Sequence, residues 1–257
     1  MNEARRLSGK VVVITGGTSN IGKGCATRAA AEGATVVVTG RDPKRGADTE
    51  QEIRSTGGNV HYHAMDVMVE ADWTRTIDDV LAKHGRIDAL VNNAGDCILK
   101  PIETLGLDTL WYLLQINLEA AFMGIKHGMP AIARSGGGSI VNISSVAGIK
   151  AGANSTGYGT SKAGMTNITK TAALEGAGNK VRVNAVHPGL IWSGHSQVKA
   201  FGEEGAKKFR VMIESKTPLH TVGAASDIGG IVAYLVSDQA RSVTGTEIVV
   251  DGGYAMA

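Results

Sequence analysis

Short apolar runs alternate along the chain with longer stretches whose apolar residues have helical spacing. The short runs are rich in valine and isoleucine at consecutive positions, which predicts strands buried on both faces of a sheet. Seven strands are predicted, over residues 11–15, 35–40, 59–67, 88–95, 139–145, 181–189 and 246–253. Helices are predicted between them, among others over residues 23–32, 72–83, 107–134, 156–177 and 226–237.

This alternation predicts an α/β fold in which right-handed crossovers build a parallel sheet. The expected product is one doubly wound, seven-stranded parallel sheet with helices on both faces. Residues 1–257 contain no proline-rich linker, internal repeat or low-complexity tract that would divide them, so one domain is expected. In such sheets ligands bind beyond the carboxyl ends of the strands, and the chemistry is expected there.

Composition and charge exclude several classes of function. The 257 residues are 43% hydrophobic and 19% charged, with a net charge of +2. No basic block predicts nucleic-acid binding, and no apolar run reaches the roughly 18 residues that a membrane span needs. The chain opens without a secretory hydrophobic segment, and Cys25 and Cys97 form neither a disulfide framework nor a metal motif. A reducing, cytoplasmic setting is therefore expected.

A glycine-rich turn, TGGTSNIG, follows the first predicted strand and leads into a helix. Glycine lets the backbone approach a pyrophosphate, and the amides at the positive end of the helix favour its charge. The turn is expected to need a positive φ at Asn20, because asparagine tolerates that conformation best among non-glycine residues. The residues expected to contact a dinucleotide here are Gly16, Thr18, Ser19, Asn20, Ile21 and Gly22.

The end of the second strand indicates which nicotinamide cofactor binds. An NAD site usually presents an acidic side chain here to the ribose, whereas an NADP site presents an arginine to the 2′-phosphate. Gly40 stands where the acid would be and Arg41 follows it, which favours NADP(H) over NAD(H). A solvated turn arginine is the alternative interpretation.

Polar residues also follow the third and fourth strands. Asp66 and Val67 form a pair able to contact adenine, and Asn93, Ala94 and Gly95 end the fourth strand. Asparagine amides at such a point either satisfy backbone groups of a turn or face a ligand.

The residues with the most specific chemistry are a tyrosine and a lysine on one face of a predicted helix. Tyr158 and Lys162 are four residues apart, and Ser145 ends the preceding strand. A phenol is a poor base near neutral pH unless a cation such as Lys162 favours the phenolate, and Ser145 could hold a substrate oxygen during proton transfer. An ordinary exposed tyrosine–lysine pair is the alternative. Asn117, alone in an apolar stretch, is expected to be hydrogen-bonded in the core or in a polar site.

Taken in order, these residues resemble the motifs of the short-chain dehydrogenase/reductase family. The resemblance covers the whole chain, from Leu7 to the terminal Asp251-Gly252-Gly253. It implies a Rossmann fold and reversible hydride transfer between a nicotinamide ring and a carbinol or ketone carbon of a small-molecule substrate. The motifs in register are Thr15-Gly-x-x-x-x-x-Gly22, Asp66, Asn92-Asn93-Ala94-Gly95, Asn117, Ser145, Tyr158-x-x-x-Lys162 and Pro188-Gly189.

The resemblance implies a role for each of four residues. Tyr158 would be the general acid/base, and Ser145 would orient the substrate oxygen. Lys162 would lower the pKa of the tyrosine and hold the nicotinamide ribose, while Asn117 would support a water that continues the proton relay. The 13-residue gap to Tyr158 that is usual in the family selects Ser145 over Ser144.

The resemblance also assigns the segment after the sixth strand and the state of assembly. Pro188, Gly189, Ile191 and Ser193 match the segment that touches the nicotinamide carboxamide, and residues 190–216 would form a partly helical substrate lid. A homotetramer is implied, in which helices 107–134 and 156–177 meet across two-fold axes. The small residues expected at those contacts are Ala120, Ala121, Gly124, Ala163 and Gly164.

Two departures from the family bear on the cofactor. Asn20 replaces a glycine, and Thr18, Ser19 and Asn20 include no basic residue of the kind that many NADP-dependent members carry. The preference for NADP(H) therefore rests on Arg41. The alternatives are an NAD-dependent dehydrogenase of a secondary alcohol, diol or sugar, and a dinucleotide-binding regulator without turnover, which would be expected to have lost a catalytic residue.

No metal site is predicted. The histidines of the sequence HYH, His61 and His63, share one face of a strand, but no third ligand is adjacent to them.

Overall fold

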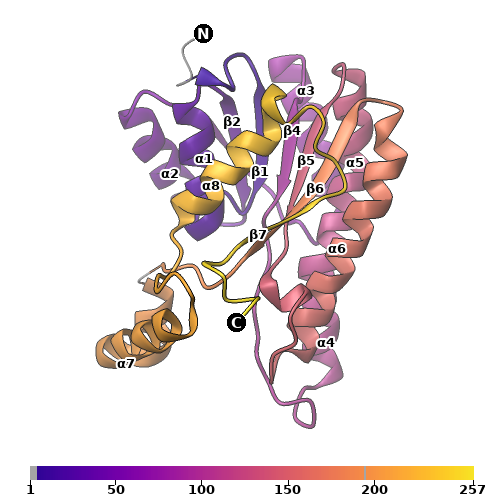
Figure 1. Cartoon of the computed structure of the whole chain (residues 1–257). Helices are drawn as coiled ribbons and strands as arrows, with labels where there is room; N and C mark the ends of the chain where they lie inside the picture. Colours follow the sequence, from indigo (N-terminus) through magenta and orange to yellow (C-terminus); the bar gives the residue numbers. More distant parts are fainter. Residues whose placement is uncertain (1–4, 194) are drawn as a thin grey trace.

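The computed structural model describes residues 5–193 and 195–257, and Figure 1 shows a twisted sheet flanked by helices. The strands are β1 (Val11–Thr15), β2 (Thr35–Gly40), β3 (Asn59–Ala64), β4 (Ala89–Asn92), β5 (Gly138–Ile143), β6 (Val181–Pro188) and β7 (Glu247–Val250). They pair in parallel in the order β3-β2-β1-β4-β5-β6-β7, which confirms the predicted seven-stranded parallel sheet. The order reverses between β1 and β4, where doubly wound sheets bind their ligands.

The helices cover both faces of the sheet, with α1, α2 and α8 on one face and α3, α5 and α6 on the other. Within residues 5–193 and 195–257 no helix is long and apolar enough to cross a membrane. The bounds are α1 (Asn20–Ala31), α2 (Pro43–Ser55), α3 (Glu70–His84), α4 (Leu107–Leu114), the π-helical turn η2 (Gln115–Glu119), α5 (Ala120–Arg134), the 3₁₀ turn η3 (Val146–Gly148), α6 (Thr156–Ala177), α7 (His195–Lys216), α8 (Ala225–Val236) and the 3₁₀ turn η4 (Asp238–Ala240).

Two hydrophobic cores lie on opposite sides of the sheet. Successive strand residues point to opposite faces, so Val12 and Ile14 of β1 pack with α1 and α8, whereas Val11 and Val13 pack with α3 and α5. All four side chains are at most 5% exposed. Burial on both faces explains why the strands are apolar at consecutive positions.

Four strands end at least two residues earlier than their sequence patterns predict. The predicted strands reach residues 67, 95, 145 and 253, whereas β3, β4, β5 and β7 end at Ala64, Asn92, Ile143 and Val250. The residues beyond these points leave the sheet as loops. Their backbone is therefore free of strand pairing and can turn toward a ligand at the carboxyl edge.

Helix α2 is not predicted by the hydrophobic pattern. Only Gly46, Thr49 and Ile53 of its residues are buried, so it shows little apolar periodicity. It begins because Asp42 caps it, accepting hydrogen bonds from the backbone of the second and third residues after it at 3.0 and 3.2 Å.

The single helix predicted over 107–134 is interrupted. α4 ends at Leu114, and the π-helical turn η2 precedes α5. The wider turn places Asn117, whose side chain is fully buried, toward the loop after β4. Such π-helical insertions occur often at functional sites.

The segment predicted as a lid contains α7, which stands away from the sheet in Figure 1. Gly202, with φ 69° and ψ 171°, breaks it into two helical parts. The rings of Phe201 and Phe209 lie 5.0 Å apart across this break, and Arg210 lies 5.5 Å from the Trp192 ring.

Candidate active site

One threonine hydroxyl holds the carboxyl ends of β1 and β4 together. Thr15 Oγ1 accepts hydrogen bonds from the backbone of Asn93 and Ala94 at 3.0 and 3.1 Å. In return, Asn93 Nδ2 donates to the carbonyls of Thr15 and Gly16 at 2.8 and 3.2 Å. The Asn93 amide therefore shapes the glycine-rich turn, which is the first of the two possibilities that its sequence position leaves open.

The glycine-rich turn between β1 and α1 has no room for larger residues. A Cβ on Gly16 would lie 3.1 Å from Ala94 Cα, and one on Gly22 would lie 2.3 Å from the Gly16 carbonyl oxygen. Asn20 has a φ of 42°, as predicted. Helix α1 begins without a side-chain cap at Ser19 and without an acidic residue in its first turn. Its positive end therefore faces the turn with no protein carboxylate in that first turn to compete with an anion.

The end of β2 lies beside this turn. A Cβ on Gly40 would lie 3.2 Å from the Thr18 hydroxyl, so an acidic residue there would crowd Thr18. The Arg41 side chain is 67% exposed and its Nη1 lies 3.9 Å from Asp66 Oδ2, a loose ion pair. Val67 is buried in the core next to α3, and its contact with adenine stays a prediction.

Asn117 fixes the loop that follows β4. Its Nδ2 donates to the Asp96 carbonyl at 2.9 Å, and its Oδ1 accepts from the Asp96 backbone N–H at 3.1 Å. A Cβ on Gly95 would lie 2.4 Å from the same Oδ1. The buried amide is thus satisfied by backbone at the carboxyl edge.

The structure brings Ser145, Tyr158 and Lys162 together at the ends of β5 and α6. Ser145 Oγ accepts from the Ala147 backbone N–H at 3.1 Å, and the Ser145 hydroxyl hydrogen-bonds to the Tyr158 phenol. Lys162 is buried; its Nζ donates to the Ile143 carbonyl at 2.9 Å and lies 5.9 Å from the centre of the Tyr158 ring. The three side chains form one connected group.

Burial, more than charge, sets the pKa values of this group. It raises the pKa of Tyr158 to about 12, and the hydrogen bond with Ser145 offsets only part of the rise. Burial also lowers the pKa of Lys162 to about 8. Desolvation of the phenolate is the largest cause of the shift, and the lowering of this pKa by Lys162 that the resemblance implies stays a prediction.

Ser144 faces away from this group. Its side chain is buried, and Oγ donates to the Lys162 carbonyl at 3.0 Å and lies 3.3 Å from Thr166 Oγ1. This engagement with α6 supports the choice of Ser145, made on spacing, as the serine beside Tyr158.

The segment after β6 returns to the same edge. Pro188 ends the strand, and Gly189 donates its backbone N–H to the last carbonyl of β7 at 3.0 Å. Ile191 is buried and forms a parallel bridge with Gly223, and the half-buried Ser193 follows it. This segment is therefore anchored on its two sides before α7 begins.

Comparison with known proteins identifies the family. The family model described as enoyl-(acyl carrier protein) reductase matches residues 16–255. The crystal structure of a short-chain dehydrogenase/reductase from Burkholderia xenovorans superposes with a TM-score of 0.94, at 36% identity over 99% of both chains. The chain is a short-chain dehydrogenase/reductase.

Two relatives show the kind of chemistry found in this family. The cyclopentanol dehydrogenase of Comamonas sp. (strain NCIMB 9872) is 35% identical over 97% of this chain and 98% of the relative. The NADP-dependent (R)-specific alcohol dehydrogenase of Lentilactobacillus kefiri is 37% identical over 97% of this chain and 98% of its own length. The protein is accordingly an NAD(P)-dependent oxidoreductase acting on CH–OH groups.

The residues of this short-chain dehydrogenase/reductase fit a nicotinamide dinucleotide. The cradle at Gly16 and Gly22, which a Cβ would fill, and the uncapped start of α1 suit a pyrophosphate. Gly95 lies beside Lys162, since a Cβ there would be 3.5 Å from Nζ. The cofactor would therefore extend from α1 past Gly95 toward Lys162 and Tyr158.

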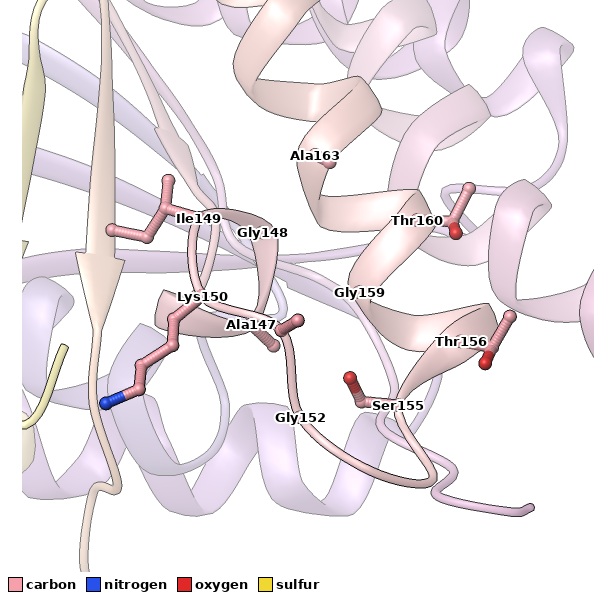
Figure 2. A pocket seen from close by; sticks show the side chains of 11 residues that line it. Ala147, Gly148, Ile149, Lys150, Gly152, Ser155, Thr156, Gly159, Thr160 and Ala163 are labelled. Atoms are coloured by element: carbon pink, nitrogen blue, oxygen red, sulfur yellow. The ribbon is translucent and has the colours of Figure 1, made fainter. Parts of the chain in front are cut away.

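A hollow of about 370 Å³ lies between the loop after β5 and the first turns of α6 (Figure 2). Most of its lining residues are small, and Ser145 and Tyr158 are not among them. Lys150 points away from it, and its Nζ donates to the Tyr254 carbonyl at 3.0 Å. This hollow is therefore distinct from the space where a substrate would meet Tyr158.

Two residues of the dehydrogenase site, Thr15 and Asp96, make contacts that their sequence positions did not predict. Asp96 is exposed beside the catalytic group, accepting from the Tyr112 hydroxyl at 3.0 Å and from the Cys97 N–H at 2.8 Å. Thr15 was noted as part of a motif, without its bridging role. A carboxylate directly after Asn-Ala-Gly was the available signal for Asp96, but its proximity to Tyr158 depends on the fold.

Asp96→Asn is expected to move the pH dependence of alcohol oxidation to lower pH. After burial, the negative charges of Cys97 and Asp96 also raise the pKa of Tyr158. Asparagine keeps an acceptor but removes the charge, so the phenolate forms at lower pH and the alkaline rise of kcat starts earlier. The measurement is kcat against pH for both proteins. Asp108→Asn removes an exposed charge that does not shift Tyr158, and an equal shift in that variant contradicts the prediction.

Proposed function

We propose that this protein transfers a hydride reversibly between NADP(H) and a secondary alcohol or its ketone, with Tyr158 as general acid/base. The observation that carries the proposal is the hydrogen bond between Ser145 and Tyr158 with the buried Lys162 ammonium behind them. When bound, the cofactor supplies or accepts the hydride. The protein's own residues orient the substrate oxygen and move its proton.

The proton is exchanged at the Tyr158 hydroxyl. A pKa of about 12 keeps this phenol protonated at neutral pH, ready to donate to the oxygen of a ketone. Ser145 gives the substrate oxygen a second hydrogen-bond partner and so fixes its distance from the phenol. Lys162, held by the Ile143 carbonyl, orients toward the nicotinamide ribose, and Asn117 supports the water chain that restores the proton.

NADP(H) is the proposed cofactor because Gly40, the last residue of β2, carries no carboxylate that would hold the ribose hydroxyls or repel a 2′-phosphate. Gly40 is followed by the exposed guanidinium of Arg41, at the side of the turn that contains Thr18. The NADP dependence of the Lentilactobacillus kefiri relative is in keeping with this choice.

The proposed substrates are small cyclic or linear secondary alcohols and their ketones. The cyclopentanol and (R)-specific alcohol dehydrogenases among the relatives support this class. Residues 190–216, with Trp192 and the paired rings of Phe201 and Phe209, are proposed to close over the substrate as an aromatic lid. The break at Gly202 gives this lid two parts.

A steady-state assay tests the proposed function. Purified protein is given cyclopentanol and a panel of linear secondary alcohols with NADP⁺ or NAD⁺, and formation of the reduced nicotinamide is followed by absorbance. Turnover with at least one alcohol and the reverse reaction on its ketone is expected. Absence of turnover in both directions with both cofactors contradicts the proposal.

A homotetramer is the proposed assembly, and exposed apolar side chains on α4, α5 and α6 support it. Leu107 and Trp111 of α4 and Phe122 of α5 have exposed fractions of 70%, 61% and 52%, and Leu174 of α6 is 82% exposed. Of the small residues expected at this contact, only Ala163 is exposed.

The other small residues pack within the chain, so that part of the sequence prediction is wrong. Ala120 and Ala121 are buried in the protein interior, and Gly124 lies against Asn92 and Trp73. Gly164 lies against a leucine of η2.

The expected mass in light scattering at micromolar concentration is that of four chains. Trp111→Glu is expected to shift the mass toward smaller species, because it places a charge in a buried apolar contact. Val211→Glu is the matched control on α7, where valine is 65% exposed outside the proposed interface. A wild-type monomer, or equal effects of the two variants, contradicts the proposed interface.

A further inference from the structure

One buried histidine has no role in the proposed proton transfer. His187 of β6 is fully buried, and its Nδ1 lies 2.9 Å from the Ser145 carbonyl oxygen. A carbonyl oxygen only accepts hydrogen bonds, so Nδ1 carries the proton and donates it to Ser145. The imidazole therefore binds the backbone of the residue that contacts Tyr158.

This contact lies where the strand pairing between β5 and β6 stops. The last paired residues are Ile143 and Val186, after which the Ser144 N–H donates to the Val186 carbonyl at 2.8 Å. Within the residues that the structure describes, Ser145 is not paired with a neighbouring strand. The Ser145 carbonyl accepts hydrogen bonds from the Gly148 backbone N–H at 2.9 Å and from His187. Up to Ser144, backbone hydrogen bonds join β5 to β6, and at Ser145 the imidazole of His187 takes their place.

The far edge of the ring faces a charged pair. Glu247 Oε2 lies 3.3 Å from His187 Nε2, and Glu247 Oε1 lies 2.6 Å from Lys170 Nζ. The 3.3 Å separation is within ion-pair distance, but its angle is not that of a hydrogen bond, and within the described residues Nε2 has no hydrogen-bond partner. The firm contact of the ring is therefore the one to Ser145.

We propose that His187 is a positioning residue that fixes Ser145 against Tyr158 through the Ser145 carbonyl. The kinetic part of this inference rests on the proposed function, whereas the effect on the backbone after β5 does not. With the imidazole donor removed, the Ser145 carbonyl keeps only the contact within its own turn, and the serine hydroxyl samples positions away from the phenol. The chemical step then slows, while the cradle for the pyrophosphate, built from β1, β4 and α1, is unaffected.

Three substitutions separate this donor from the volume of the ring. His187→Asn places its amide nitrogen the same number of bonds from the backbone as Nδ1, so it keeps the donor to Ser145. His187→Gln places it at the position of Nε2, facing Glu247. His187→Leu fills the site without a donor. Each is compared by hydrogen exchange of residues 144–150 and by kcat, KM and the Kd of the cofactor.

His187→Leu and His187→Gln are expected to speed exchange in residues 144–150 and to lower kcat roughly tenfold, the size of one lost hydrogen bond, with the cofactor Kd unchanged. His187→Asn is expected to restore slow exchange and most of kcat. If His187→Asn is as impaired as His187→Leu, or if His187→Leu matches wild type in both measurements, the proposal is wrong. If wild type shows no turnover but the exchange pattern holds, the proposed function fails and the positioning of Ser145 stands.

Discussion

Tyr158→Phe is expected to lower kcat by a factor of order 10² to 10⁴, because it removes the proton donor but keeps the ring. The phenol is the group that Ser145 contacts, and its pKa of about 12 makes it an acid that is intact at neutral pH. The Lys162 contact to the Ile143 carbonyl does not involve the phenol, so cofactor affinity is expected to survive. Steady-state rates in both directions and a cofactor titration measure the two effects separately.

The matched control is Tyr234→Phe, which removes a phenol from α8 on the face of the sheet covered by α1. Turnover of this control is expected to equal that of wild type. Near wild-type turnover of Tyr158→Phe would falsify the assignment of Tyr158 as the acid. Equal losses in both tyrosine variants would instead indicate a general loss of stability, which a thermal melt distinguishes.

NADP(H) is expected to bind ten- to a hundredfold more tightly than NAD(H), and Arg41→Ala is expected to remove most of that difference. A charge-assisted contact between a guanidinium and a phosphate contributes roughly 1.5 to 3 kcal/mol, which corresponds to this range of affinity. The Arg41 side chain is largely exposed, and the carboxylate with which it pairs, that of Asp66, lies 3.9 Å away, so the guanidinium is available for this contact. Titration of the protein with both reduced cofactors at fixed salt measures the preference.

Two features limit the preference for NADP(H): Thr18, Ser19 and Asn20 of the glycine-rich turn are all neutral, and salt screens an exposed ion pair. Arg241→Ala is the control, because Arg241 follows η4, whose Asp238 pairs with Lys10 at the opposite edge of the sheet. Equal affinity for both cofactors, or tighter binding of NADH, means that Arg41 is a solvated turn residue. The NAD-dependent dehydrogenase is then the correct assignment.

The sheet was predictable because a strand that is buried on both faces is apolar at consecutive positions. Val11 to Ile14 are apolar at every position, since each face of β1 has a core against it. The glycine-rich turn was equally clear, and the positive φ of Asn20 follows from local sterics alone. The proximity of Tyr158 and Lys162 needed only helical spacing, and the addition of Ser145 needed the topology.

Features that depend on packing between distant segments could not be predicted. The π-helical turn at Asn117 exists because its amide meets both backbone groups of Asp96, a contact across 21 residues. The raised pKa of Tyr158 depends on how deeply the phenol is buried. The four-residue spacing of Tyr158 and Lys162 gives no information about that burial. In the sequence, His187 is indistinguishable from other residues of its predicted strand. Its contact with the Ser145 carbonyl depends on the register of β5 against β6.

The position of β1 in the middle of the sheet also has a consequence for biosynthesis. Residues 11–92 contain β1 to β4, which form the contiguous half-sheet β3-β2-β1-β4, so the switch point and the glycine-rich turn can assemble from the first part of the chain to leave the ribosome. Strands β5, β6 and β7 emerge later and extend the sheet outward from β4. Ser145 and Tyr158 emerge with them. On the proposed function, the half-sheet that would hold the adenosine half of the cofactor is therefore synthesised before any group that can move a proton.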